Sequence, residues 1–198
     1  MTDERVWHEA LAGSPEAWGE LFLRHGKAIY AYCYRRTGER GAAEDLASAV
    51  FLEAWKLRAR AEASAANALP WLYGIATMLS RNHHRTLRRY SAALERMGPP
   101  EAVPEPDPAL EVAQRVDAQR RLRHVRTLLD SLAQADRDVL ELAAAGTLGI
   151  AEIAEALDVP VGTAKSRLSR ARRRLNDLLA RSGGQAGETA RPLGRALQ

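Results

Sequence analysis

A run of prolines divides this chain near its middle. Five of the nine prolines fall between Pro99 and Pro108. A helix cannot continue through them, because proline lacks a backbone N–H and its ring clashes with the preceding turn. The sequence therefore predicts two small domains, at residues 1–97 and 111–181. An acidic proline-rich linker is expected between them, at residues 98–110, and a disordered Gly- and Ala-rich tail is expected at residues 182–198.

Both domains are predicted to be helical. Ala, Leu, Arg and Glu dominate, whereas aromatic residues make up only 6% of the chain, and this composition favours helices over sheets. Ser14-Pro15-Glu16 offers a cap, a first-turn proline and a first-turn acid, so a helix is expected to start there. Pro70 is expected to open another helix that runs to about Tyr90. We therefore expect an all-α fold.

The helix after Ser14 is predicted to bury one face. Its apolar and aromatic residues recur at steps of three and four, which is the spacing of a single helical face. The predicted buried residues are Trp18, Leu21, Phe22, His25, Ile29, Tyr32 and Cys33.

The last two helices are predicted to form a helix-turn-helix. A short helix over residues 149–157 is followed by Asp158-Val159-Pro160 and then by a long helix from Val161 to about Ala180. Asp is tolerated in the left-handed conformation that such a sharp turn requires. The small Ala154 permits the close crossing of the two helices.

The long helix carries a dense basic face. Six basic residues and no acidic one lie between Lys165 and Arg174, and such a density repels itself unless phosphate neutralises it. The first turns of a recognition helix reach base edges, and later arginines reach phosphates. A solvated face of an ordinary helical hairpin is the alternative. The residues predicted to contact duplex DNA are Gly162, Thr163, Lys165, Ser166, Arg167, Ser169, Arg170 and Arg173.

A second basic face is predicted on the helix that begins near Pro70. Four of its basic residues share one side of the helix. Trp71 and Tyr73 lie at its start, where aromatic rings beside cations can stack on unpaired bases. A core position for Trp71 is the alternative. The candidate residues for this second nucleic-acid surface are Trp71, Tyr73, Arg81, Asn82, His84, Arg85 and Arg88.

Several other classes of protein do not fit the sequence. Cys33 is the single cysteine, so an intramolecular disulfide is impossible. The five histidines lack metal-ligand spacing, and no phosphate-binding glycine loop is present, so we predict no enzyme, no metal and no cofactor. Neither a signal peptide nor a membrane-spanning segment is evident, and a cytoplasmic protein without membrane contact is expected.

Three motifs together resemble the sigma factors of bacterial RNA polymerase, in particular the short two-domain extracytoplasmic function (ECF) type. Ala43-Glu44-Asp45-Leu46 with the residues from Val50 to Trp55 is similar to region 2.2 of that family. This resemblance implies docking on the clamp helices of the largest polymerase subunit. The residues implied in docking are Asp45, Leu46, Val50, Phe51 and Trp55. Ala47-Ser48-Ala49 departs from the polar pair usual in the family.

The two basic helices also have counterparts in that family. Residues 71–76 with 81–89 are similar to regions 2.3 and 2.4, which open the minus 10 element and read its non-template strand. Residues 132–142 and 152–172 are similar to region 4, which reads the minus 35 element, although Gly149 replaces the usual Ser or Thr cap. The partners implied are core RNA polymerase, through its clamp helices and flap region, and promoter DNA, both duplex and melted. An anti-sigma factor is a further candidate partner.

Two alternatives remain at this point. A dimeric helix-turn-helix regulator would use the same final helices with residues 1–97 as a ligand or dimerisation domain, and a helical adaptor would bind no DNA. A footprint separates them, because a dimer protects two symmetric half-sites whereas a sigma factor protects two unlike elements and needs core polymerase. The acidic residues of the linker would either line the polymerase cleft or belong to a plain spacer. They are Glu101, Glu105 and Asp107.

Overall fold

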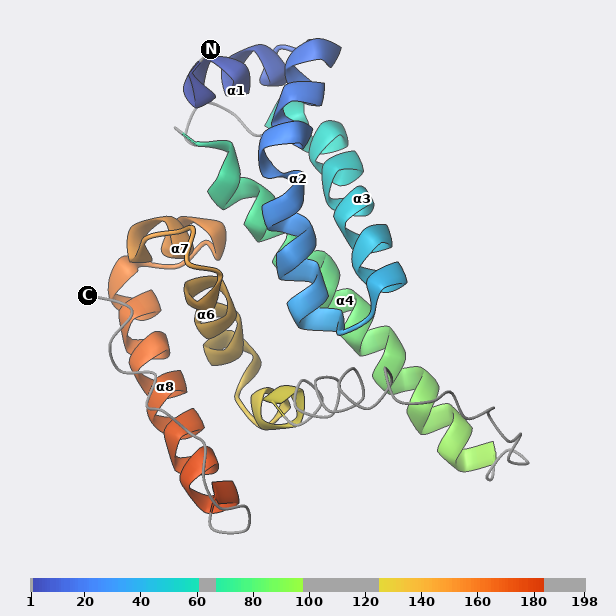
Figure 1. The fold of residues 1–198 in the computed structure, drawn as a ribbon, viewed down its shortest axis with the longest axis vertical. Coiled ribbons are helices and arrows are strands. Elements are labelled where there is room, and N and C mark those ends of the chain that lie inside the picture. The colour runs from blue at the N-terminus through green and yellow to red at the C-terminus, as the bar shows by residue number, and fades with distance from the viewer. Residues whose placement is uncertain (1, 61–66, 98–124, 184–198) are drawn as a thin grey trace, which may run out of the picture.

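The computed structural model describes residues 2–60, 67–97 and 125–183, and every regular element in these ranges is helical (Figure 1). The predicted linker and all but the start of the predicted tail lie outside the described residues. The first domain consists of α1 (Asp3–Leu11), α2 (Pro15–Thr37), α3 (Arg40–Leu57), a 3-10 turn (Arg58–Arg60) and α4 (Ala68–Met97). The second contains a helical turn at 125–130, then α6 (Gln134–Ala145), α7 (Ile150–Ala156) and α8 (Val161–Gly183).

Local signals explain where α2 begins and ends. The backbone N–H of Ala17 donates to Ser14 Oγ at 3.2 Å, and Pro15 occupies the first turn, which confirms the predicted start. Gly38 ends the helix with φ 73°, a left-handed conformation that glycine adopts without a Cβ penalty.

Helix α4 is longer at both ends than the sequence indicated. Asn67 Oδ1 accepts a hydrogen bond from the Leu69 N–H at 3.1 Å, so the helix begins at Ala68, before Pro70. A proline is tolerated in the first turn because its missing N–H would have no helical partner there. The helix continues past Tyr90 to Met97, and its last turns extend beyond the α2–α3 pair (Figure 1).

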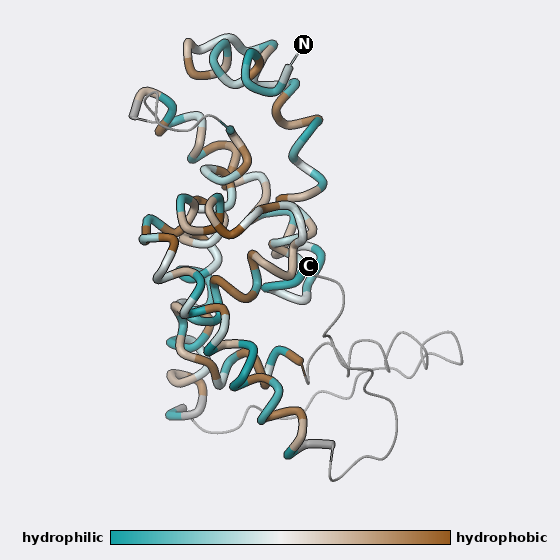
Figure 2. Tube along the Cα trace, turned by 90° about the vertical axis from the view of Figure 1, so that its left-hand side faces the viewer, coloured by the Kyte–Doolittle hydropathy of each residue, from teal (hydrophilic) through white to brown (hydrophobic). Residues whose placement is uncertain are grey.

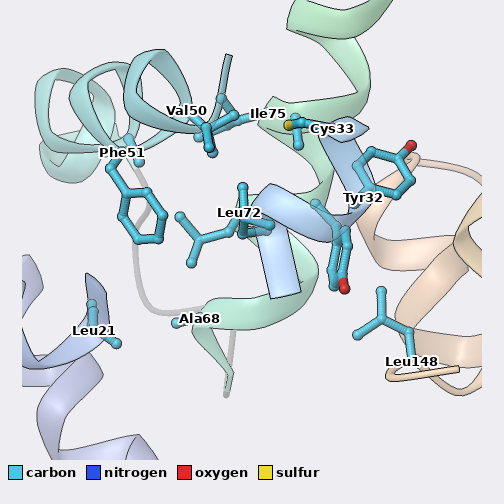
Figure 3. Close-up of a cluster of buried hydrophobic side chains, with 14 of the residues drawn as sticks. Leu21, Tyr32, Cys33, Val50, Phe51, Ala68, Leu72, Ile75 and Leu148 are labelled. Atoms are coloured by element: carbon cyan, nitrogen blue, oxygen red, sulfur yellow. The ribbon is translucent and has the colours of Figure 1, made fainter. Parts of the chain in front are cut away.

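The core of the first domain lies where α2, α3 and α4 meet. Leu21, Val50 and Leu72 are buried there, together with Ile75 (Figure 3). Phe22 was predicted to join this core, but the structure shows it 50% exposed. It lies one residue beyond the buried stripe, and one residue rotates the helix by about 100°. The prediction for Phe22 was wrong.

The hydrophobic core continues into the second domain. Val139, Leu142 and Leu148 belong to the same buried cluster as Tyr32 and Tyr73 of the first domain. In the close-up, Leu148 reaches the cluster from the second domain on the side where Tyr32 lies (Figure 3). The two domains therefore pack against each other, an arrangement that helical periodicity does not predict.

Hydrophobic and hydrophilic residues alternate along each helix, as amphipathic helices require (Figure 2). Within the described ranges, no helix combines the length and apolar character needed to cross a lipid bilayer.

Candidate nucleic-acid interface

The helix-turn-helix forms as predicted from α7, the turn at Asp158 and α8. Asp158 adopts φ 51°, and the N–H of Val159 donates to the Ala154 carbonyl at 3.0 Å. Ala154, Ala164 and Ala171 are all buried. Because their side chains are small, the helices can cross closely.

A glutamate at the third position of α7 supplies the half of a capping box that does not depend on the side chain of residue 149. Glu152 Oε2 accepts a hydrogen bond from the Gly149 N–H at 2.7 Å, which satisfies one of the free donors at the start of α7. Glu152 Oε1 accepts from Asn67 Nδ2 at 3.2 Å. A single carboxylate therefore caps α7 and links it to the start of α4.

The predicted contact residues of α8 lie along its first four turns. Lys165 and Ser166 are exposed, whereas Thr163 and Arg167 are partly buried. Ser166 Oγ donates to the Thr163 carbonyl at 3.0 Å, which holds the hydroxyl against the helix. The other exposed residues of the predicted set are Gly162, Ser169, Arg170 and Arg173.

One of these arginines is held by the second domain itself. Arg170 Nε and Nη2 each donate to a carboxylate oxygen of Asp136 on α6, both at 2.6 Å. The hydrogen bonds from Arg170 lower the pKa of Asp136, and the charge of Arg167 lowers it further. Such two-point pairing fixes the guanidinium in one orientation. Arg170 is therefore oriented toward α6 and helps to set the position of α8.

The basic face of α4 is partly covered by carboxylates of the second domain. Arg81 Nε donates to Asp138 Oδ2 at 2.8 Å, and Arg88 Nη2 donates to Asp130 Oδ1 at 3.4 Å. Arg85 is exposed. Two of the arginines predicted to contact DNA therefore already have anionic partners within the chain.

The aromatic residues at the start of α4 pack inward. The ring of Trp71 lies 5.2 Å from that of Trp7, and Tyr73 is 1% exposed with its ring edge-on to Tyr32. Thr147 Oγ1 of the second domain donates to Tyr73 Oη at 2.9 Å. In this arrangement Tyr73 cannot stack on a base, and Trp71 packs against the core.

A buried ion cluster between the domains was not predicted. Arg36 is completely buried, and its Nη2 donates to Asp138 Oδ1 at 2.8 Å. Its Nη1 lies 2.7 Å from Glu141 Oε2 and also 2.7 Å from Tyr32 Oη, to which it donates. Arg36 continues the buried stripe of α2 four residues after Tyr32, and an arginine on an apolar stripe is a signal of buried pairing.

His84 lies beside this cluster and is half-buried. The pKa of its imidazole is lowered from the ordinary 6.5 to about 4, first by burial and then by the charges of the nearby Arg137 and Arg36. The charge of Asp130 raises the pKa of His84, and the charge of Arg126 lowers it. The imidazole is therefore neutral at pH 7 in the closed arrangement.

Acidification should loosen the contact between the two domains. A histidine whose pKa is lower in the closed arrangement binds its proton more readily when the domains separate. The stabilisation from neutral His84 is complete above about pH 6.5 and is lost as the pH falls toward 4. We expect the radius of gyration, measured by small-angle X-ray scattering, to increase between pH 7 and pH 5. A His84→Gln variant should lack this increase in that interval, and an equal increase in both proteins would contradict the assignment to His84.

The residues implied in polymerase docking divide into two groups. Asp45 is exposed and Leu46 is partly buried, whereas Val50 and Phe51 lie in the core. Trp55 is partly buried. The ring of Trp55 lies 5.3 Å from that of Trp18 and 3.8 Å from the Arg58 guanidinium, and the ring of Phe51 lies 4.9 Å from that of Phe22.

Two exposed apolar residues of α2 and α3 were not predicted as surface residues. Leu52 is 57% exposed and lies two helical turns after Asp45, on the same face of α3. Phe22 of α2 contacts Phe51 edge-on and is itself half-exposed. The seven-residue spacing from Asp45 to Leu52 could have identified Leu52 from the sequence.

The described residues contain no group of three or more His, Cys, Asp or Glu side chains arranged to hold a metal ion.

Comparisons with known families agree with both halves of this architecture. Residues 21–90 match the family model described as Sigma-70 region 2, and residues 122–175 match the one described as Sigma-70, region 4. The first range contains α3 and most of α4, and the second contains the helix-turn-helix. A region 2 domain stands where a dimeric regulator would have a ligand or dimerisation domain, so the regulator is not favoured.

Curated relatives carry the same assignment. The chain is 31% identical over 182 residues to the ECF RNA polymerase sigma factor SigE of Mycolicibacterium smegmatis, covering 88% of this chain and 66% of that protein. It is 31% identical over 144 residues to the RNA polymerase sigma factor HrpL of Pseudomonas syringae pv. syringae, covering 73% of this chain and 77% of that protein.

Solved structures share the fold. CnrH, in complex with the cytosolic domain of CnrY, superimposes with a TM-score of 0.65 at 21% identity over 90% of this chain and 97% of that one. The sigma factor RpoE of Bartonella quintana, in complex with the anti-sigma factor NepR, has a TM-score of 0.57 at 23% identity over 82% of this chain and 96% of that one. The region 2 and region 4 matches together define the class of this protein as a transcription initiation factor. The chain belongs to the sigma factors of bacterial RNA polymerase, in their ECF group.

Proposed function

We propose that the two basic helices bind two promoter elements. Helix α8 binds the minus 35 duplex, and helix α4 binds the minus 10 element. The observation that carries this proposal is the presence, on one chain, of a helix-turn-helix and a second helix with its own basic face. For α8 the proposed contacts are the exposed Gly162, Lys165, Ser166, Ser169 and Arg173 together with the partly buried Thr163 and Arg167.

The proposed minus 10 surface is narrower than the sequence implied. It consists of Arg81, Asn82, His84, Arg85 and Arg88, with Arg85 and Asn82 exposed. Trp71 and Tyr73 support it from the core side, because their rings pack against Trp7 and Tyr32. Holding two elements at once raises avidity, since the second contact forms at the effective concentration set by the connection between the domains.

The proposed polymerase-docking surface lies on the outer side of α2 and α3. Asp45 supplies a carboxylate, and Leu52 and Phe22 supply exposed apolar area. Leu46 and Trp55 border them, whereas Val50 and Phe51 support the surface from beneath. An exposed apolar patch next to a charged group is typical of a protein interface.

Replacing Asp45 with alanine should weaken binding to core polymerase without unfolding the chain. Asp45 is exposed, so its loss removes a partner contact but little packing. We expect the dissociation constant, measured by fluorescence anisotropy with labelled protein, to rise about fivefold or more. Glu4→Ala removes an exposed carboxylate from α1 and serves as the matched control. Equal binding by both variants would remove Asp45 from the docking surface.

The remaining assignments follow from the family and from the relatives. We infer a cytoplasmic location, because the polymerase and the promoter are found there, and a non-enzymatic role for the chain itself. CnrH and the B. quintana RpoE were solved with CnrY and the anti-sigma factor NepR. We propose that an anti-sigma factor also binds this chain.

Footprinting with and without core polymerase tests the promoter assignment. We expect protection of two unlike elements only when polymerase is present. Two symmetric half-sites protected by the chain alone would overturn the proposal and favour a dimeric regulator.

A further inference from the structure

The anionic partners of α4 come from the domain that is proposed to bind a different DNA element. Asp138 of α6 accepts hydrogen bonds from Arg81 and from Arg36, each at 2.8 Å, and its side chain is fully buried. Asp130, just before α6, pairs with Arg88 of α4 and with Arg137 of α6. Carboxylates therefore lie against Arg81 and Arg88, where phosphates would have to lie during minus 10 recognition.

A close helix approach accompanies these ion pairs. A Cβ on Gly74 of α4 would lie 2.7 Å from the carbonyl oxygen of Ala156 at the end of α7. Real Cβ atoms essentially never come so near backbone oxygen, so the contact between α4 and α7 depends on glycine at this position. The Asn67–Glu152 and Thr147–Tyr73 hydrogen bonds join the same two domains. The interface thus combines apolar packing, hydrogen bonds and buried charge.

We propose that this interface is an autoinhibitory contact, in which Asp138 and Asp130 occupy the basic face of α4 in place of DNA phosphates. The proposal rests on the assignment of that face to the minus 10 element. Carboxylate and phosphate are both anions that pair with arginine, so α4 cannot hold both at Arg81 and Arg88. DNA binding at these positions therefore requires the domains to separate.

If most molecules are closed, the apparent affinity for DNA is lower than the affinity of the open form. When only a minor open population is competent to bind, the apparent affinity falls in proportion to that population. A partner that binds the separated domains better than the closed ones shifts this equilibrium, and DNA must favour opening by the same coupling.

Asp138→Asn tests the contact with little change of shape. The amide removes the charge that holds Arg36 and Arg81, so the variant should open more often. We expect it to bind a fluorescein-labelled single-stranded oligonucleotide of mixed sequence about fivefold more tightly than the parent chain, without polymerase. Glu4→Gln makes the same charge change at an exposed site on α1 and should show much less gain. An equal gain in both variants would overturn the proposal, because net charge alone would then explain it.

Gly74→Ala tests the same contact through sterics instead of charge. The added methyl group meets the Ala156 carbonyl, so the closed packing should fail and the radius of gyration in X-ray scattering should increase. Gly41→Ala adds the same group on α3, where nothing lies within 4 Å, and should leave the radius unchanged. Circular dichroism establishes that each variant is folded. An unchanged radius and unchanged DNA affinity in folded Gly74→Ala would overturn the proposal.

Arg85→Ala distinguishes a failure of the autoinhibitory contact from a failure of the minus 10 assignment. Arg85 is exposed on α4, so its loss should weaken oligonucleotide binding in the parent and in Asp138→Asn. If Arg85→Ala weakens binding but Asp138→Asn and Gly74→Ala do not strengthen it, autoinhibition is wrong and the minus 10 assignment stands. If Arg85→Ala has no effect either, the assignment of α4 itself is wrong.

Discussion

Replacing Lys165 or Arg167 with alanine should lower promoter-dependent transcription about tenfold while core polymerase binding is unchanged. Both residues lie in the first turns of α8, the part of a recognition helix that reaches base edges. Losing a base contact costs about 1–3 kcal/mol, which corresponds to roughly 5- to 150-fold in affinity. Run-off transcription and a polymerase-binding assay on the same preparations measure the two quantities separately.

Arg181→Ala is the matched control for this prediction. Arg181 is also an exposed arginine of α8, but it lies about 20 Å further along the helix axis, beyond the turns that reach a groove. It should leave transcription close to the parent level. Equal loss of transcription and of polymerase binding in Lys165→Ala or Arg167→Ala would contradict a role in promoter recognition.

Replacing Leu72 with alanine should strongly lower the stability of the first domain. Leu72 of α4 is 0% exposed and packs in the cluster formed with α2 and α3. Truncating a buried leucine removes apolar contacts and leaves a cavity, at a cost of about 2–5 kcal/mol. Urea unfolding followed by circular dichroism measures the change in the free energy of unfolding.

Leu23→Ala makes the same chemical change on the surface. Leu23 is 77% exposed, so the free energy of unfolding should change by no more than about 0.5 kcal/mol. A similar loss in both variants would show that Leu72 is not part of the packed core and would contradict the described arrangement of α2, α3 and α4.

The sequence predicted those features that depend on neighbouring residues. Ser14 caps α2 and Asp158 adopts the left-handed turn, and both follow from local backbone chemistry. The six basic residues of α8 lie on a single helix, so their grouping was visible from spacing alone. The start of α4 was placed less well, because Asn67 caps that helix from outside the apolar pattern.

The contact between the domains could not be predicted from helical periodicity. Arg36 and Asp138 are 102 residues apart, and nothing in the spacing of either helix indicates that they meet. The residues next to Gly74 likewise do not indicate that glycine is required there. Glycine is required because a Cβ would collide with the Ala156 carbonyl of a helix that is distant in the sequence. Such pairs depend on how the domains pack.

The candidate sites were predicted as helix faces more reliably than as individual contacts. Periodicity identifies which stripe of a helix is apolar but not how wide the buried stripe becomes after packing. Tyr73 therefore proved to be buried although it had been assigned to a partner surface, and Phe22 proved to be exposed although it had been assigned to the core.

Run-off transcription with purified core polymerase and a genomic promoter pool tests the central claim most directly. The assignment as an ECF sigma factor predicts transcripts that require this chain and start downstream of two unlike, regularly spaced elements. Transcripts that appear equally without the chain, or no transcripts although the chain binds core polymerase, would contradict it.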